Sequence, residues 1–325
     1  MAVFTPVSDA DARELLLHYH LGEMRSLQGI SAGIENTNYF LTTTTGDYVL
    51  TLFEVLSYEQ LPFYIELMHY LAQKGLAVPS PQALKDGSRL TRLHNKPCAI
   101  VSRLPGSYVA APTAAHCALA AQTMATMHLA AKDYALHQPN LRSLAWWEKT
   151  IPTLLPHLTA EQSQLIQRSL QQQQDFFASA FYQQLPEGPA HCDLFRDNVL
   201  FYNSADQLHM GGIIDFYFAG CDKWLFDVAV SANDWCIHHD TGEFQLGLLK
   251  AWLQAYNQVR PFTAAEHQAW PTMLQAAALR FWVSRLYDYY QPRPAESLKP
   301  HDPTHFERIL KSRLHTTYAL EELLN

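Results

Sequence analysis

The stretch HCDLFRDNVLFYNSADQLHMGGIIDF, residues 191–216, carries the pattern that decides the fold of this chain. It places His191, Asp193 and Asn198 at fixed spacing, then continues as an apolar run, a polar turn and a second apolar run that ends in Asp215. Two apolar runs around a polar turn predict a β-hairpin. Asn198 would open its first strand and Asp215 would follow its second, so both side chains are expected at the same end of the hairpin.

These residue types suit phosphoryl transfer from ATP, in which the protein mainly positions the reactants and neutralises charge. Mg²⁺ on the phosphates prefers oxygen ligands, and Asn198 and Asp215 would supply them. One carboxylate must orient the acceptor hydroxyl and take its proton, which is the role we expect of Asp193. The kinase signature H-R-D-L-x-x-x-N followed by D-F-G has the same layout, although Cys192 replaces its Arg and Tyr217 its Gly.

Two further residues of this region are expected to give structural support. His191 belongs to the motif, and Asp227 at the start of a later helix is expected to brace the loop through backbone N–H groups. A zinc site at His191 and Cys192 is the alternative, but no second Cys/His pair with ligand spacing lies nearby.

Composition sets the outer limits. The chain has 325 residues, enough for two lobes with their own cores, and a net charge of −8 that argues against nucleic acid or an anionic membrane surface as partner. Its five scattered cysteines never form C-x-x-C, and the N-terminus lacks a secretory pattern, so we expect a reducing, cytoplasmic setting. Residues 104–131 contain no charged side chain but are interrupted by Pro and Gly, which predicts a core helix and not a membrane span.

Residues 1–103 are predicted to form a nucleotide-binding lobe. A capped helix precedes three strand-like runs, at 26–30, 37–43 and 48–54. The small-residue loop between the first two runs holds Gly33 and Asn36, whose backbone could lie over phosphates, although an ordinary hairpin loop has the same composition. A further strand at 98–106 ends in Pro-Gly and marks the expected hinge, where adenine would bond to backbone groups from Ser102 to Leu104.

Residues 104–325 are predicted to form a larger, mostly helical lobe that binds the acceptor and carries the catalytic loop. The helices are expected at 113–131, 143–157, 159–183, from 222 onward, and at 243–259, 271–290 and 303–323. The fold class is therefore α+β and two-lobed. Only eleven residues separate Asp215 from Asp227, and no A-P-E follows. This leaves no room for the activation segment of a protein kinase, so the acceptor should be a small molecule.

The motifs together resemble the aminoglycoside phosphotransferase-like branch of the protein-kinase-like fold, which includes aminoglycoside, choline and methylthioribose kinases. The shared features are H-x-D-L-x-x-x-N, I-D-F, the Pro-Gly hinge, Met127-His128 and W-x-x-D from Trp224 to Asp227. More narrowly, the segments GIENTNYF, YVLTLFE, LPFY, HCDLFRDN, IDFYFA and ALRFWVSRLYD look like those of bacterial homoserine kinases, and this likeness spans nearly the whole chain.

The resemblance implies transfer of phosphate from MgATP to the side-chain hydroxyl of L-homoserine, a step of threonine biosynthesis. It also implies that Asp193 is the base and that Asn198 and Asp215 hold magnesium. One departure stands out: Thr51 occupies the position at which kinases carry a phosphate-binding Lys, and no Lys or Arg lies between Arg25 and Lys74.

Acceptor recognition is the least specific prediction. An amino acid offers a carboxylate and an ammonium, so its pocket should present Arg and Asp or Glu. Arg280, Ser284 and Asp288 share one helix face at i, i+4 and i+8, and either line this pocket or form a surface Arg–Asp pair. The same chemistry on choline, methylthioribose or an aminoglycoside stays open, as does a non-catalytic nucleotide-binding module, whose only support is the missing Lys.

Overall fold

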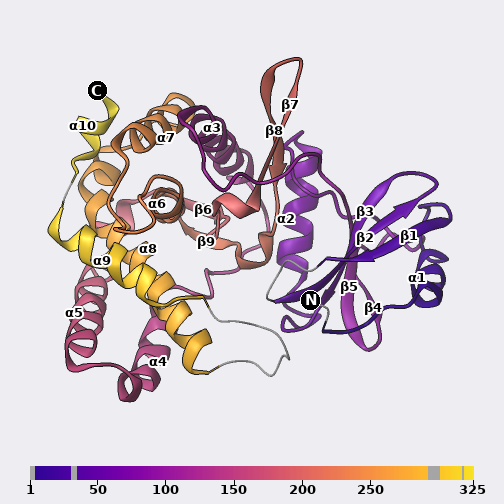
Figure 1. The fold of residues 1–325 in the computed structure, drawn as a ribbon, viewed down its shortest axis with the longest axis horizontal. Coiled ribbons are helices and arrows are strands. Elements are labelled where there is room, and N and C mark those ends of the chain that lie inside the picture. The colour runs from indigo at the N-terminus through magenta and orange to yellow at the C-terminus, as the bar shows by residue number, and fades with distance from the viewer. Residues whose placement is uncertain (1–3, 31–34, 292–300, 317) are drawn as a thin grey trace. The chain divides into compact units, whose positions relative to one another are not determined.

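In the computed structural model of the protein, residues 4–30, 35–291, 301–316 and 318–325 are described. Gly33, expected to contact phosphates, lies outside them. The described residues form two compact units, one up to Pro105 and one from Gly106 onward. Figure 1 shows the sheet-based first unit in indigo and purple, and the helical second unit from magenta to yellow. The α+β class expected from the sequence is confirmed.

The first unit is built on a five-stranded antiparallel sheet with strand order β1-β2-β3-β5-β4. The strands are β1 (Met24–Gly29), β2 (Asn36–Thr43), β3 (Asp47–Phe53), β4 (Thr91–Leu93) and β5 (Lys96–Ser102). The three strands expected within residues 26–54 are each confirmed to within two residues. Helix α1 (Asp9–Leu16) begins with the predicted cap, because the Ser8 side chain accepts a hydrogen bond from the backbone N–H of Asp11.

The amphipathic pattern of residues 57–74, followed by Gly75, predicts a helix, and helix α2 (Pro62–Gln73) is shorter than that prediction. Residues 57–60 form a turn instead, closed by a 3.2 Å hydrogen bond from the N–H of Gln60 to the carbonyl of Ser57. Pro62 then occupies the first helical turn, where its missing N–H costs nothing. The helix ends as predicted before Gly75, whose φ of +81° only glycine adopts freely.

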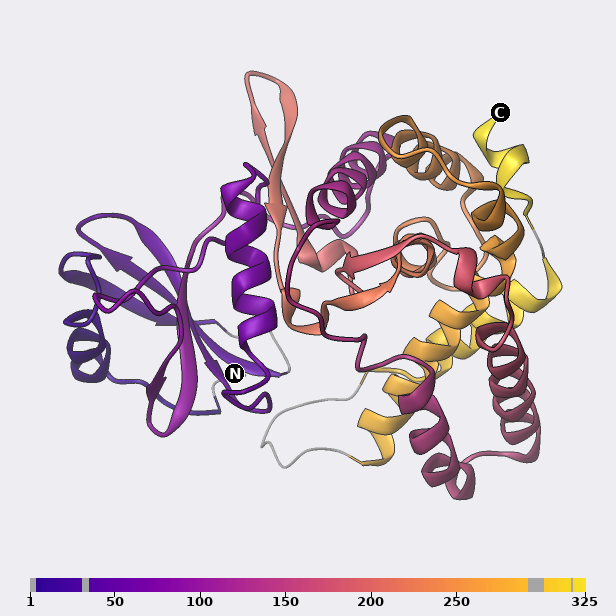
Figure 2. The same cartoon turned by 180° about the vertical axis from the view of Figure 1, so that it is seen from behind.

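The second unit is mostly helical and also contains two small sheets, β6 with β9 and β7 with β8. Its helices are α3 (Ala114–Ala131), α4 (Leu144–Leu154), α5 (Ala160–Phe177), α6 (Trp224–Trp235), α7 (Leu246–Val259), α8 (Ala264–Tyr290), α9 (Thr304–His315) and α10 (Leu320–Leu324). Its strands are β6 (Glu187–Ala190), β7 (Val199–Ser204), β8 (Gln207–Ile213) and β9 (Gly220–Lys223). Every residue of α6 is buried, and Figure 2 shows this helix enclosed by its neighbours while the β7–β8 hairpin stands out from the helices of this unit.

Several helix boundaries in this unit differ from the sequence prediction. Helix α8 begins at Ala264, seven residues before the expected start, because Thr263 and Glu266 form a capping box and Pro271 lies inside the helix. The single helix expected at 303–323 is two helices, and α5 ends at Phe177. Among the described residues, no helix has both the length and the apolar character needed to span a bilayer.

Candidate active site

The β7–β8 hairpin gives the site its frame. The polar residues 203–205 between the two apolar runs predict the turn there, and it lies slightly later, at Ala205 and Asp206, with φ of 49° and 60°. Beyond the last ladder pair, the N–H of Ile214 donates a 2.9 Å hydrogen bond to the carbonyl of Asn198. This bond extends the pairing by one step, so Asn198 and the neighbouring Asp215 lie at the same end of the hairpin.

His191 ties the loop before the hairpin to the strand that precedes Asp215. Its imidazole is fully buried, and its Nε2 lies 2.9 Å from the carbonyl oxygen of Ile214. Burial lowers the pKa of His191, so the ring is neutral and its one proton belongs on Nε2, where the carbonyl accepts it. Both His191 and Asn198 therefore contact Ile214, which brings the loop and the end of β8 together.

Asp227, on the first turn of α6, holds the same loop. Its two carboxylate oxygens accept hydrogen bonds from the N–H groups of His191 and Cys192, both at 2.8 Å, and one oxygen lies 3.0 Å from Nε2 of His128. Burial opposes ionisation of Asp227, but the hydrogen bonds from the two histidines outweigh it and lower the pKa. Cys192 has a left-handed φ of 61°, and the carboxylate stabilises this strained turn directly before Asp193.

Asn198 and Asp215 offer oxygens suited to Mg²⁺. The side-chain amide of Asn198 donates from Nδ2 to the carbonyl of Asp193 at 2.8 Å, which leaves Oδ1 as the atom available to an ion. Asp215 has a left-handed backbone, with φ and ψ both 61°. No group of three His, Cys, Asp or Glu side chains in the described part of the chain could enclose a metal by itself. Mg²⁺ fits such a set, since it commonly takes one or two protein oxygens and completes its shell with phosphate and water.

Asp193 lies in an environment that strongly perturbs it. Burial raises the pKa of its carboxyl to about 8, the positive charge of Arg280 opposes this rise, and the negative charge of Asp215 adds to it. The carboxylate is still 17% exposed, so a reactant can reach it. A carboxyl whose pKa is moved toward neutrality by its surroundings is suited to exchange a proton with an alcohol.

Arg280 lies beside Asp193, with its Nη2 3.7 Å from Oδ1 of the carboxylate. Its guanidinium is nearly buried, packs over the ring of Phe281 at 3.7 Å, and keeps one buried N–H, on Nε, without a partner. The alternative of a surface pair with Asp288 is therefore wrong for Arg280. Asp288 is half-buried, two turns farther along α8.

Sequence reasoning missed Arg285, which is also on α8 and whose charge interacts with both Asp193 and Asp288. Its side chain is half-buried, and no hydrogen bond or ion pair within the described residues occupies it. The signal was available, because Arg285 stands three residues before Asp288 on the same helix, at contact distance. Arg280 and Arg285 thus place two positive charges near the carboxyl group of Asp193.

The remaining nucleotide-binding candidates lie in the first unit. Asn36 is almost buried at the start of β2. The N–H of Ser102 already donates to the carbonyl of Ser80 at 2.9 Å, so it is not available to adenine. Leu104 makes no backbone hydrogen bond within the part of the chain that the structure describes, and its N–H and carbonyl can pair with a base edge.

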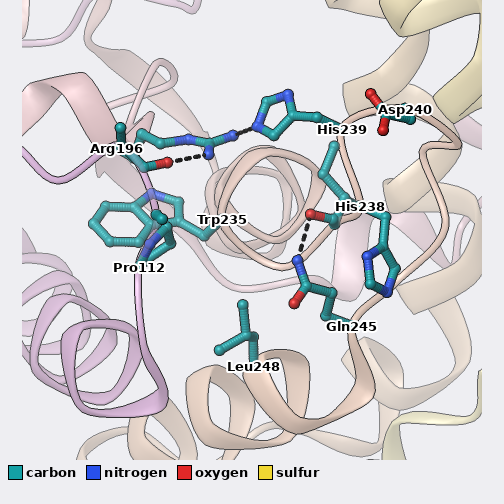
Figure 3. Close-up of a pocket in the computed structure, with 11 residues that line it drawn as sticks. Pro112, Arg196, Trp235, His238, His239, Asp240, Gln245 and Leu248 are labelled. Atoms are coloured by element: carbon teal, nitrogen blue, oxygen red, sulfur yellow. Dashed lines mark hydrogen bonds between the residues drawn. The ribbon is translucent and has the colours of Figure 1, made fainter.

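A pocket of about 250 Å³ in the second unit contains none of the predicted site residues. Its wall includes Pro112, Trp235 and Leu248, and its rim carries His238 and His239 (Figure 3). Arg196, from the loop between Asp193 and Asn198, also lines it, but its guanidinium is engaged by Asp234, His239 and the carbonyl of Ala110. This pocket is therefore distinct from the surroundings of Asp193.

Comparison with known proteins identifies the family. Residues 26–262 match the family model described as the phosphotransferase enzyme family. Two curated relatives, the homoserine kinases of Burkholderia lata and Paraburkholderia phytofirmans, are each 55% identical to this chain. The first alignment covers 99% of this chain and 98% of the relative, and the second covers 97% and 96%.

Solved structures with the same fold are more distant in sequence. An amicoumacin kinase is 17% identical with a TM-score of 0.72, and the match covers 98% of this chain and 97% of that one. An ethanolamine kinase from Plasmodium vivax is 13% identical with a TM-score of 0.61, over 93% and 86% of the two chains. These likenesses establish the protein-kinase-like fold, and the full-length relatives establish the family. The chain belongs to the homoserine kinases of the phosphotransferase enzyme family.

Proposed function

We propose that this protein transfers the γ-phosphate of ATP to the side-chain hydroxyl of L-homoserine, giving O-phospho-L-homoserine and ADP in threonine biosynthesis. The observation that carries this proposal is the hydrogen-bonded unit around Ile214, which joins the loop of Asp193 and Asn198 to the strand end at Asp215. The full-length similarity to proteins named homoserine kinase supports the choice of acceptor.

In the proposed mechanism, Asp193 is the base. Its carboxylate accepts the proton of the acceptor hydroxyl while that oxygen forms a bond to the γ-phosphorus and the bond to the ADP oxygen breaks. Asn198, through Oδ1, and Asp215 would hold Mg²⁺. The bound ion would neutralise negative charge on the phosphate oxygens. Asp227 acts as a positioning residue, because it fixes the backbone of residues 191 and 192 directly before the base.

The acceptor is proposed to bind along α8. Homoserine carries a carboxylate and an ammonium, and this helix offers both complementary charges: Arg280 and Arg285 near Asp193, and Asp288 farther along. We propose that the arginine side chains bind the carboxylate and that Asp288 faces the ammonium. The buried N–H of Arg280 that lacks a partner among the described residues supports this assignment, since the carboxylate of homoserine would satisfy it.

A cytoplasmic location is proposed on the cysteine chemistry. All five cysteines are free thiols, and Cys98, Cys117, Cys192 and Cys236 are buried. Buried thiols without disulfide bonds are usual in proteins that work in a reducing compartment.

The test is ADP release with Mg²⁺ and a panel of acceptors: homoserine, choline, methylthioribose and kanamycin. We expect turnover with homoserine and little with the others. Asp193→Asn keeps the shape of the side chain and removes the base, so kcat should fall by about 10²–10⁴-fold while the Kd of ATP changes little. A variant that keeps nearly the wild-type kcat would exclude Asp193 from the chemistry. If the protein phosphorylates choline but not homoserine, the proposed acceptor is wrong, whereas the proposed role of Asp193 is unaffected.

A further inference from the structure

One face of the sheet in the first unit carries polar side chains that do not belong to the apolar core. Side chains on the opposite face, such as Tyr39, Leu41 and Leu50, belong to the apolar core that includes α1. The face away from α1 carries instead Asn38 and Thr51, which stand directly opposite each other on β2 and β3. Thr51 occupies the position at which kinases of this fold carry a phosphate-binding Lys.

The register of three strands orders this face into rows. Phe40, Val49 and Val101 form an apolar row, next to the end of β5 at Ser102. Asn38, Thr51 and Ala99 form the next row, about 7 Å farther along the strands at the usual rise per residue. The face therefore changes from apolar to polar along one direction, as a nucleotide does from base to phosphates.

Within the polar row, one hydrogen bond fixes the chemistry. The hydroxyl of Thr51 donates to Oδ1 of Asn38 at 2.7 Å. Oδ1 is thereby engaged, and no hydrogen bond from the Nδ2 amino group of Asn38 is present among the residues that the structure describes. Thr51 is 2% exposed, whereas Asn38 is half-buried, so the group that can meet a ligand is the amide donor of Asn38.

No cation takes over the position. Lys96 is paired with Glu54 at 3.1 Å, and the guanidinium of Arg103 lies 4.0 Å above the ring of Phe40, in the apolar row. In the described part of the chain, no contact brings a Lys or Arg to Asn38.

We infer that Asn38, oriented by Thr51, donates a hydrogen bond to a phosphate group of the nucleotide and so replaces the missing Lys. The inference rests on the proposed use of ATP. An amide donor contributes a directed, neutral hydrogen bond to an anionic oxygen, in contrast to the point charge of an ammonium. Charge neutralisation would then depend more on the bound magnesium.

The experiment measures nucleotide binding in the absence of acceptor, by isothermal titration calorimetry of ATP and of adenosine with Mg²⁺. Asn38→Ala should raise the Kd of ATP about 10-fold and leave the Kd of adenosine unchanged, because only ATP carries phosphates. Asn38→Asp, of nearly equal size, should raise the Kd of ATP at least as much, because the new carboxylate repels the phosphates. Thr51→Val should raise the Kd of ATP by a smaller factor. Thr51→Ser, which keeps the hydroxyl, should bind ATP with the affinity of the wild type.

The control variant is Thr42→Val, which removes a similar cross-strand hydrogen bond, to Asp47 at 2.7 Å, at the other end of the same strand pair. It should leave both affinities unchanged. The assignment is overturned if Asn38→Asp binds ATP as tightly as the wild type, or if both Asn38 variants lose adenosine and ATP equally. A wild type that binds ATP but does not turn over homoserine would reject the proposed reaction and leave the role of Asn38 intact.

Discussion

Arg280 connects the expected base to the proposed acceptor pocket. It lies 3.7 Å from Asp193, packs over Phe281, and has an unpaired buried N–H on Nε. A buried guanidinium with only one carboxylate nearby is costly to maintain in the apoprotein. Its retention is best explained by a second anion that arrives with the substrate.

This explanation predicts a selective defect in Arg280→Met, which keeps an unbranched apolar stem and removes the charge. The KM of homoserine should rise by about 10–100-fold, because a hydrogen bond to a charged group is lost, while the KM of ATP stays the same. The substrate analogue 3-aminopropan-1-ol has the hydroxyl and the ammonium but no carboxylate. The variant should therefore lose more of its kcat/KM for homoserine than for this analogue, since loss of the charge raises the pKa of Asp193 for both acceptors alike, and steady-state kinetics with both acceptors measures the ratio.

Arg280→Lys serves as the matched variant, since it restores the charge without the planar fork. It should recover part of the preference for homoserine over the analogue. An unchanged KM for homoserine in Arg280→Met would remove Arg280 from the pocket.

At the scale of the element, helix α6 functions as a rigid support for the catalytic loop. Besides Asp227, it contributes Ser231 and Trp235, whose hydroxyl and indole N–H both donate to the carbonyl of Leu194 at 3.0 Å. Backbone groups on both sides of Asp193 are thus held by one fully buried helix. Such support keeps a catalytic carboxylate in place without a direct contact to it.

We expect Asp227→Asn to weaken the hydrogen bonds that hold the loop to α6. The substituted side chain keeps one acceptor but turns a donor toward the backbone N–H groups of His191 and Cys192, so one of these hydrogen bonds is lost. The free energy of unfolding should fall by about 2–4 kcal/mol, measured by urea denaturation, and kcat should fall more than KM rises. Ser231→Ala, which removes a single bond to the same loop, should cost less in both measurements. Equal effects of the two variants would argue against a special role for Asp227.

The elements also show what the sequence could predict. The strands around Thr51 and the hairpin before Asp215 follow alternating or apolar runs bounded by turn residues, and these local signals fix them. The start of α8 was misplaced because Pro271 resembles a first-turn proline, whereas the capping box of Thr263 and Glu266 lies seven residues earlier. The loss of the Pro271 N–H is tolerated in this long and largely buried helix.

At the scale of the whole molecule, contacts between residues far apart in the sequence could not be predicted. Asp193, Asn198 and Asp215 lie within one short segment, so a local hairpin was enough to place them together. The contact between Asp193 and Arg280 joins residues far apart in the chain, and it depends on how α8 packs against α6. No periodicity in the sequence encodes that packing, which is why the position of Arg280 stayed undecided.

Several histidines of the second unit make its stability depend on pH. Burial lowers the pKa of His128 and His191, and it lowers the pKa of His305, together with the nearby charge of His239, to about 4. Each of these groups binds a proton more weakly in the folded protein than in the unfolded chain, where its pKa is 6.5. At these three histidines, protons therefore favour the unfolded chain once the pH falls below 6.5, and the stability that they contribute is complete only above that value.

Relative to a variant that lacks one of these histidines, the thermal midpoint of the wild type should fall further as the pH is lowered from 6.5 to 5, because Asp193, whose pKa is raised to about 8, titrates in both proteins alike. The half-buried His305, which stacks on His239 at 5.2 Å, offers a test of this pH dependence. His305→Gln removes one titrating group and should reduce the loss of stability between pH 7 and 5 by about 1 kcal/mol. His20→Gln, at an exposed position of the first unit, should leave the pH profile unchanged. If both variants follow the wild-type curve at every pH, His305 does not contribute to the acid sensitivity.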